Sequence, residues 1–339
     1  MLNQLKVLTE LPGISGREEK VREYIISQIK DLADEITVDN MGSVIALKKG
    51  SESGGKRLMI SAHMDEVGLI ITHICPDGML KFSSVGGIDP RVIVGRQVFI
   101  GENKIPGVVG IVPIHLTKGD DQSSCPKEDA MLIDIGAASR EEAEKYVHPG
   151  DYCVWGTEFA SFGDGRLKGK AIDDRAGCAM MIELMKGSYR YDIYFTFVTM
   201  EEVGLRGATC AAYTVAPDFA IVLEATTASD IAGVKEGDQV CCVGKGAVVG
   251  FMDRRTIYDR GLFDMALRIG SEKNIAVQVK QAVAGGNDAG AIQQSGKGVR
   301  TIAVSLPCRY IHAPCSVIAE SDLRASFDLV REMIAEIQG

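Results

Sequence analysis

RLMISAHMDEVGLIITHI, residues 57–74, is the stretch in which the chain changes character. Its first part, RLMISAH, is the short apolar run that is typical of a buried strand. The residues HMDE at 63–66 follow, and beyond them the composition of the chain is different. The sequence therefore predicts a structural boundary near Glu66, directly after a strand that carries His63 and Asp65.

The region after this boundary, residues 67–167, consists of short β-rich runs separated by clusters of glycine, proline and aspartate. The clearest runs are RQVFIG, GVVGIV, AMLIDIG and DYCVWG. Runs of this kind are typical of a small all-β barrel or sandwich. A second boundary lies near Lys168, so that residues 1–66 and 168–339 are predicted to form one discontinuous domain around the insertion.

Helices alternate with strands on both sides of the insertion. Upstream, Ser15 and Glu18 form a capping-box pattern ahead of VREYIISQIKDLADEI, residues 21–36, which predicts a helix. Downstream, the predicted helices include DRAGCAMMIELMK, LRGATCAAYTV and the closing ESDLRASFDLVREMIAEIQ, and the strands include YDIYFTFVT, DFAIVLEA and VRTIAVSLP. This alternation predicts an α/β fold with a mixed, largely parallel sheet sandwiched by helices and interrupted by a small inserted β-barrel.

Residues that carry metal chemistry lie at five places, each at or just beyond a predicted strand end or at the start of a helix. They are His63-Met64-Asp65, Asp173-Asp174, Glu201-Glu202, Glu224 and His312. Because ligand sites of open α/β sheets form outside the carboxyl ends of the strands, we expect these groups to converge there. The helix-opening GGNDAG, residues 285–290, lacks the spacing of a dinucleotide-binding loop and is interpreted as a turn near the same site.

Imidazole and carboxylate groups together suit zinc, cobalt or manganese. A pair of metal ions needs one shared carboxylate and further ligands on each side, and an additional acid must stay free to move a proton. Glu201 and Glu202 offer one acid for each of these tasks. Asp65 lies two residues from His63 on an extended segment, so its carboxylate could hold the second ring nitrogen of His63.

The chain resembles the M42 metallopeptidases, the family of tetrahedral and glutamyl aminopeptidases. The matching stretches are SAHMDEVG, AIDDRAGCA, MEEVGLRGA, EATTASD, GGNDAGAIQ and PCRYIHAP, and they run in family order across nearly the whole chain. The resemblance implies a peptidase core with an inserted β domain that acts as a lid and assembly module, which agrees with the change of texture described above.

The resemblance also implies roles for individual residues. Asp173 would bridge two metal ions, His63 and Glu224 would complete one site, and Glu202 and His312 the other. Glu201 would be the general base and acid, and Asp65 would orient His63. A cis peptide between Asp173 and Asp174 is implied as well. Glu224 is a departure, because many relatives have aspartate there and glutamate is one methylene longer.

We therefore hypothesise a two-metal aminopeptidase that hydrolyses the first peptide bond of short peptides, with a hydroxide bridging the metals as nucleophile and Glu201 as proton carrier. An aminoacylase or carboxypeptidase on the same core is the nearest alternative. Glycoside hydrolysis also uses two carboxylates, but it has no use for His63 or His312. Arg254 and Arg255 are interpreted as surface charges, with a basic element of the substrate pocket as the second interpretation.

The bulk properties limit the partners. A formal net charge of −9 argues against non-specific nucleic-acid binding, and no window approaches the ~18 apolar residues of a membrane span. Nine cysteines without a CxxC pair and an N-terminus unlike a signal peptide predict reduced thiols and a cytoplasmic location. The resemblance suggests dimers that assemble into a dodecamer.

Overall fold

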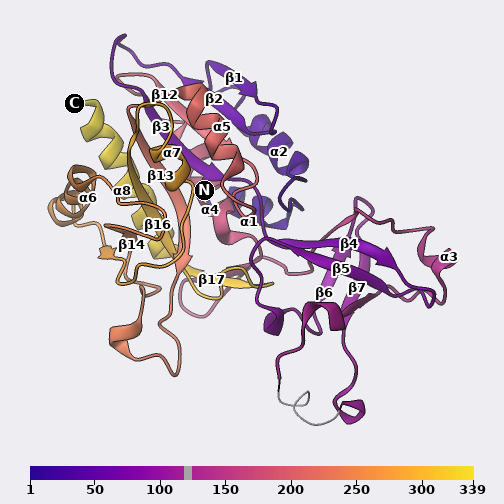
Figure 1. Cartoon of the computed structure of the whole chain (residues 1–339). Coiled ribbons are helices and arrows are strands. Elements are labelled where there is room, and N and C mark those ends of the chain that lie inside the picture. Colours follow the sequence, from indigo (N-terminus) through magenta and orange to yellow (C-terminus); the bar gives the residue numbers. More distant parts are fainter. Residues whose placement is uncertain (118–123) are drawn as a thin grey trace.

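The central element of the structure is a mixed sheet that runs through the larger part of the molecule (Figure 1). The computed structural model describes residues 1–117 and 124–339. Within these residues the sheet has eight strands in the order β1-β2-β12-β3-β13-β16-β14-β15. Their bounds are Glu35–Val38, Val44–Lys48, Ile193–Val198, Leu58–His63, Phe219–Thr227, Arg300–Cys308, Ala247–Val249 and Val277–Val279.

The four central strands, β12, β3, β13 and β16, are parallel to one another. Antiparallel pairing flanks them, because β2 pairs antiparallel with β12 and β14 pairs antiparallel with β16. The central strands are buried on both faces, which explains their nearly continuous apolar sequences. Since their carboxyl ends meet at one edge of the sheet, residues from distant parts of the sequence are brought together there.

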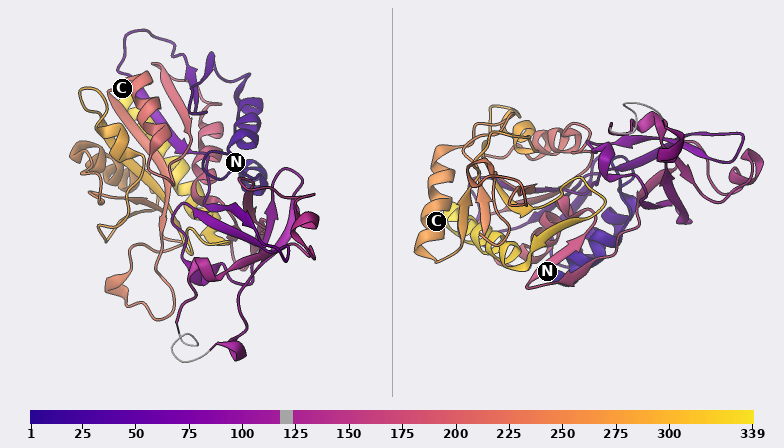
Figure 2. Two further views of the ribbon diagram at one scale, coloured as in Figure 1. Left: turned by 45° about the vertical axis from the view of Figure 1, so that its right-hand side comes forward. Right: turned by 90° about the horizontal axis from the view of Figure 1, so that it is seen from below.

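Helices cover both faces of this sheet, as Figure 2 shows in the view from below. On one face α4 packs against β3 and β13 and touches α1 and α8, whereas α5 and α7 pack together on β12, β13 and β16. The helices are α1 Leu2–Glu10, α2 Glu19–Ile29, α4 Ile172–Leu184, α5 Arg206–Val215, α6 Arg260–Glu272, α7 Ala289–Gln293 and α8 Glu320–Gln338. The predicted α/β sandwich is thereby confirmed.

A closed barrel is inserted between β3 and α4, and it stands apart from the sheet in Figure 1. Its strands, in barrel order, are β4 Gly68–Ile74, β5 Leu80–Val85, β8 Leu132–Asp134, β7 Ile105–Gly110, β6 Gln97–Ile100 and β9 Tyr152–Trp155, and a short helix, α3, spans Arg140–Ala143. The barrel has its own apolar core, which includes Leu69, Ile133 and Trp155. The change of composition in the sequence thus marks a separate apolar core. Closure of the barrel removes its exposed sheet edges.

A three-stranded antiparallel sheet, which the sequence analysis did not predict, lies at the junction. It consists of β10 Ala160–Phe162, β11 Arg166–Gly169 and β17 Ser316–Ala319. Beside it, the buried carboxylate of Glu66 accepts a hydrogen bond from Lys170 Nζ at 2.6 Å. The guanidinium of Arg175, also buried, donates to the carbonyls of Met64 and Gly13. These contacts fix both chain crossings between the α/β part and the barrel.

The predicted helix at 21–36 is partly wrong. The helix α2 ends at Ile29, and residues 35–38 form β1, whose antiparallel pairing with β2 supplies the backbone hydrogen bonds. The apolar spacing of residues 32 and 36 fits a helix, but pairing with the sheet overrides it. The helix α1 and the short strand β14 were not predicted.

The capping box is wrong as well, because both side chains have tertiary partners. Ser15 Oγ donates to Asp65 Oδ2 at 2.6 Å, and Glu18 Oε1 accepts from the N–H groups of Gly16 and Met200. The helix α2 begins after Glu18 without a side-chain cap. The motif residues therefore connect the segment before α2 to the chain after β3, through Ser15, and to the loop after β12, through Glu18.

Candidate metal centre

The predicted site residues meet at the carboxyl ends of the central strands. His63 is the last residue of β3, and Glu201 and Glu202 follow β12 after a turn in which Met200 has a φ of 55°. Glu224 lies in β13, which continues to Thr227, so the strand is longer than predicted. His312 has a φ of 57° and follows β16 in the turn that leads to β17.

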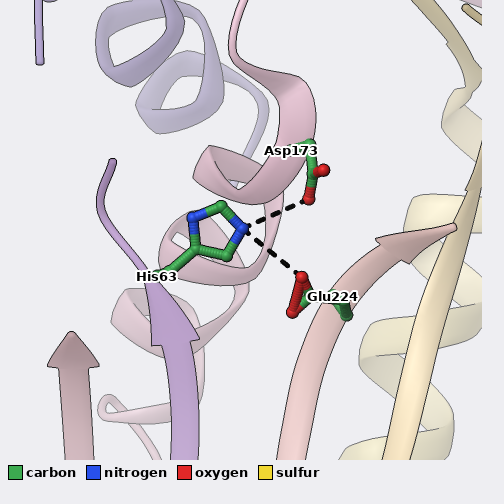
Figure 3. A group of neighbouring side chains, drawn as sticks. All are labelled: His63, Asp173 and Glu224. Carbon is green, nitrogen blue, oxygen red and sulfur yellow. Dashed lines mark ion pairs between the residues drawn. The ribbon is translucent and has the colours of Figure 1, made fainter. Parts of the chain in front are cut away.

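Asp173 comes from the start of α4, where the chain is not helical. Its φ and ψ are −80° and 112°, and the peptide bond to Asp174 is cis, as the resemblance implied. The side chain of Asp173 is buried and faces the ends of β3 and β13 (Figure 3).

Three of the predicted ligands, His63, Asp173 and Glu224, form a first buried group. His63 Nε2 lies 3.4 Å from Asp173 Oδ1 and 3.3 Å from Glu224 Oε1, as drawn in Figure 3. One ligand atom from each residue lies within 4.8 Å of the others. The longer glutamate at position 224 therefore reaches the place that the prediction assigned to it.

A second group consists of Asp173, Glu202 and His312. His312 Nε2 lies 3.3 Å from Asp173 Oδ2 and 3.2 Å from Glu202 Oε2. The two oxygens of Asp173 thus face different imidazoles, Oδ1 toward His63 and Oδ2 toward His312. This division of one carboxylate between two groups is the arrangement that a shared metal ligand needs.

The candidate ligand atoms lie close together, and several of them make no hydrogen bond. His63 Nε2, Asp173 Oδ1 and Glu224 Oε2 are buried and make no hydrogen bond. Buried polar atoms are normally hydrogen-bonded, and those that are not require an explanation such as a bound ion. The donor set and these orphaned atoms therefore fit divalent metal ions.

The shifted pKa values of the centre also favour bound cations. Burial raises the pKa of Glu224 and of Glu201 well above their usual range, and it raises the pKa of Glu202 to about 8. Burial alone would lower the pKa of His312, but the neighbouring Asp173 and Glu202 raise it to about 9. Several carboxylates share one buried space with too few cationic partners, and bound cations would offset this repulsion.

Asp65 lies behind the first group. Its Oδ1 is 3.4 Å from His63 Nδ1, although the closer contact of that nitrogen, at 3.1 Å, is with the main-chain carbonyl of Asp65. The carboxylate also accepts hydrogen bonds from Ser15 Oγ and from the backbone N–H groups of Glu201 and Glu202. Asp65 thus contacts His63, as predicted, and holds the turn of the two glutamates in addition.

Glu201 lines a cavity beside the centre together with Asp173, Glu224 and His312. It also lies within 4.8 Å of ligand atoms of His63 and Glu202. Its carboxylate is therefore close enough to the centre to exchange a proton with a molecule bound there, and close enough to act as a ligand.

The barrel contributes one group that sequence reasoning missed. His312 Nδ1 is hydrogen-bonded, at 2.9 Å, to the carbonyl of Gly87, in the segment after β5. A hydrogen bond of this kind fixes the orientation of a metal-binding imidazole. The second imidazole is therefore held by the inserted part of the chain, and no local pattern in the sequence indicates this.

Two more buried acids were missed. Asp288, in GGNDAG, is fully buried with both carboxylate oxygens unpaired, and burial raises its pKa to about 7. Burial, followed by the charge of Asp65, raises the pKa of Glu18 to about 7. The turn predicted at GGNDAG is present, since α7 begins at Ala289 and Gly285, Gly286 and Asn287 line the cavity.

An α/β sheet that brings two imidazoles and several carboxylates to one edge, with a further acid beside them, defines the class of metal-dependent hydrolases. Within this class the chain belongs to the M42 glutamyl aminopeptidase family, whose family model matches residues 42–329. It is therefore a metal-dependent aminopeptidase.

Two named aminopeptidases match over almost the whole length. The chain is 32% identical to the lysyl aminopeptidase of Pyrococcus furiosus, over 98% of this chain and 96% of that protein. It is 28% identical to the glutamyl aminopeptidase of Lactococcus lactis, over 99% and 96% of the two chains.

Solved structures are also similar. An aminopeptidase of Desulfurococcus kamchatkensis has a TM-score of 0.93 at 33% identity, covering 99% of this chain and 97% of that one. The TET1 peptidase of Pyrococcus horikoshii, which can assemble into a tetrahedron or a large octahedral shell, has a TM-score of 0.85 at 35% identity, with 97% and 98% covered. An endoglucanase of Thermotoga maritima has a TM-score of 0.81 at 34% identity, with 99% of each chain covered.

Within the described residues, no helix is long and apolar enough to cross a membrane. All nine cysteines lie in the described parts of the chain and are free thiols.

Proposed function

We propose that the chain is a two-metal aminopeptidase that releases N-terminal residues from short peptides. The observation that carries the proposal is the position of Asp173 between two imidazoles, with one carboxylate oxygen toward each. Asp173 would be the shared ligand, His63 and Glu224 would hold one ion, and Glu202 and His312 the other. The imidazole and carboxylate donors suit zinc, cobalt or manganese.

When bound, the ions supply Lewis-acid polarisation of the peptide carbonyl and increase the acidity of water. The chain's own contribution is proton transfer and positioning. Glu201 accepts the proton of the attacking water and passes it to the departing amine.

The free α-amine of the substrate lies beside Glu224 in the cavity, and this contact limits cleavage to the first peptide bond. Asp65 keeps the turn of Glu201 and Glu202 in place through two backbone hydrogen bonds. These roles describe an exopeptidase; an aminoacylase or a carboxypeptidase on the same core is the alternative that the following test separates from it.

The test is a panel of aminoacyl anilides and short peptides, each supplied with a free and with an acetylated N-terminus, in the presence and absence of EDTA. The proposal predicts cleavage of the free forms only and its loss with EDTA. Cleavage of acetylated substrates would indicate an aminoacylase or carboxypeptidase. Hydrolysis of a soluble cellulose that EDTA does not affect would indicate a glycoside hydrolase.

We also propose that the protein acts in the cytoplasm as a closed assembly built from dimers. One structurally similar peptidase forms a tetrahedron, and dimers along the six edges of a tetrahedron give the predicted twelve chains. Nine free thiols are consistent with a reducing compartment.

A further inference from the structure

The cavity beside the metal centre has a volume of about 300 Å³. Asp173, Glu201 and Glu224 form its acidic part. The remaining wall comes from the end of β13, from β14 and from the loop 284–287, with Thr226, Val248 and Lys280 among the lining residues. A peptide whose amine lies beside Glu224 would place the side chain of its first residue in this cavity.

Lys280 is the single lysine or arginine among the described residues that line the cavity. It follows β15 directly, and its backbone N–H donates to the Val249 carbonyl at 2.9 Å. Its half-buried ammonium donates to the carbonyl of Ala284 at 3.0 Å. The base and the tip of this side chain are thus held on the cavity wall.

This ammonium has no ion-pair partner among the described residues, where no carboxylate oxygen lies within 4.0 Å of it. The nearby Asp253 is engaged elsewhere, since it accepts from Tyr258 Oη at 2.6 Å and from the N–H groups of Arg255 and Thr256. Burial lowers the pKa of Lys280, whereas the charges of Asp253, Cys241 and Glu224 raise it. An ammonium that is partly desolvated and unpaired gains from an incoming carboxylate.

The arginines that the sequence analysis considered for a basic pocket do not supply this charge. Neither Arg254 nor Arg255 lines the cavity. The aliphatic stem of Arg255 packs instead against Gly286 and Gly290, where an added Cβ would lie 2.8 and 2.9 Å from it. The wall of this cavity therefore has no guanidinium from this pair.

We propose that Lys280 selects acidic N-terminal residues, and that the side-chain carboxylate of a substrate aspartate or glutamate pairs with its ammonium. This inference rests on the proposed aminopeptidase function. Family membership does not decide the preference, because relatives of similar length are a lysyl and a glutamyl aminopeptidase. The charge on the cavity wall decides it here.

The test compares kcat/KM for glutamyl and leucyl anilides, otherwise identical, in the wild type and in Lys280→Met. The wild type should prefer the glutamyl substrate. The glutamyl-to-leucyl ratio should fall roughly 10- to 100-fold in Lys280→Met, which corresponds to the loss of one charge-assisted hydrogen bond. Lys280→Arg should retain the acidic preference, and Lys280→Glu should favour a lysyl anilide.

Lys297→Met is the matched control, because this lysine has an 88% exposed side chain outside the cavity and its removal should leave the ratio unchanged. If the wild type cleaves leucyl or lysyl substrates better than glutamyl ones, the inference is overturned while the proposed function stands. An equal loss on both substrates in Lys280→Met would also overturn it, since that result assigns Lys280 to support of the 284–287 loop. No cleavage of any anilide or peptide would contradict the proposed function itself.

Discussion

Glu201 and Glu202 are adjacent in the sequence and have different surroundings in the structure. Glu202 lies 3.2 Å from His312 and belongs to the second ligand group, whereas Glu201 faces the cavity beside the first. Both follow the turn at Met200, and the carboxylate of Asp65 accepts hydrogen bonds from both of their backbone N–H groups. Two identical side chains can therefore take the roles of ligand and proton carrier.

Replacement of Glu201 by glutamine should separate these roles. The amide keeps the size of the side chain but cannot accept a proton, so kcat should fall roughly 10²- to 10⁴-fold. Metal content, measured by elemental analysis, should remain near that of the wild type. Loss of metal together with activity would make Glu201 a ligand instead.

Asp65 should affect metal binding indirectly, through His63 and the turn of Glu201 and Glu202. Asp65→Asn keeps the shape but removes the charge behind His63 and weakens an acceptor of the Ser15, Glu201 and Glu202 hydrogen bonds. Metal affinity should fall roughly 10- to 100-fold, as for other partners of metal ligands. Competition with a metal-sensitive dye measures this change. Ser15→Ala, which leaves the carboxylate, should have a smaller effect, and equal affinity in Asp65→Asn and the wild type would refute the role.

At the scale of elements, the sequence predicts the strands that position the site better than it predicts the helices around it. RLMISAH, YDIYFTFVT, DFAIVLEA and VRTIAVSLP all form central strands, because each is an apolar run buried on both faces. The end of α2 and the strand β14 could not be derived, because they depend on how the chain pairs and packs in the sheet. The Gly87 contact to His312 and the unpaired Lys280 also result from tertiary packing, which no local pattern encodes.

The segment before α2 is connected to the loop after β12 through Glu18, and this contact should depend on pH. The folded protein raises the pKa of Glu18 from 4.5 to about 7, chiefly by burial. Between these values the folded chain binds more protons at this site than the unfolded chain, so this contribution to stability falls as the pH rises from 4.5 to 7.

Glu18→Gln removes the titration and keeps a hydrogen-bond acceptor. The variant should therefore gain stability relative to the wild type as the pH rises from 5 to 8, by up to about 3 kcal/mol. Urea denaturation of both proteins in parallel at each pH gives this difference. Parallel stability curves would mean that Glu18 titrates normally in the folded protein.

At the scale of the whole molecule, the barrel carries an apolar surface that faces solvent. Val108, Val112, Ile114 and Leu116 are 49%, 54%, 69% and 64% exposed. Exposed apolar residues that cluster in this way often mark interfaces. The barrel also contacts the metal centre, because the carbonyl of Gly87 is hydrogen-bonded to His312 Nδ1.

The assembly should therefore depend on this surface. Light scattering of the wild type should give about twelve times the chain mass of 36.4 kDa. Val112→Asp combined with Leu116→Asp should dissociate it into smaller species, because the new charges would have to be buried in the interface. The exposed Tyr213→Asp, on α5, is the control. A monomeric wild type would contradict the proposed assembly.

Aminopeptidase activity in this chain should depend on two ions that share Asp173 as a ligand. The most direct test of this dependence is a titration of metal-free protein with Co²⁺ or Zn²⁺, in which bound metal and release of the N-terminal residue from an unblocked peptide are measured together. If two ions are needed, no residue is released without metal, and activity is full at two ions per chain. Full activity at one ion per chain, or undiminished activity in the metal-free protein, would contradict it.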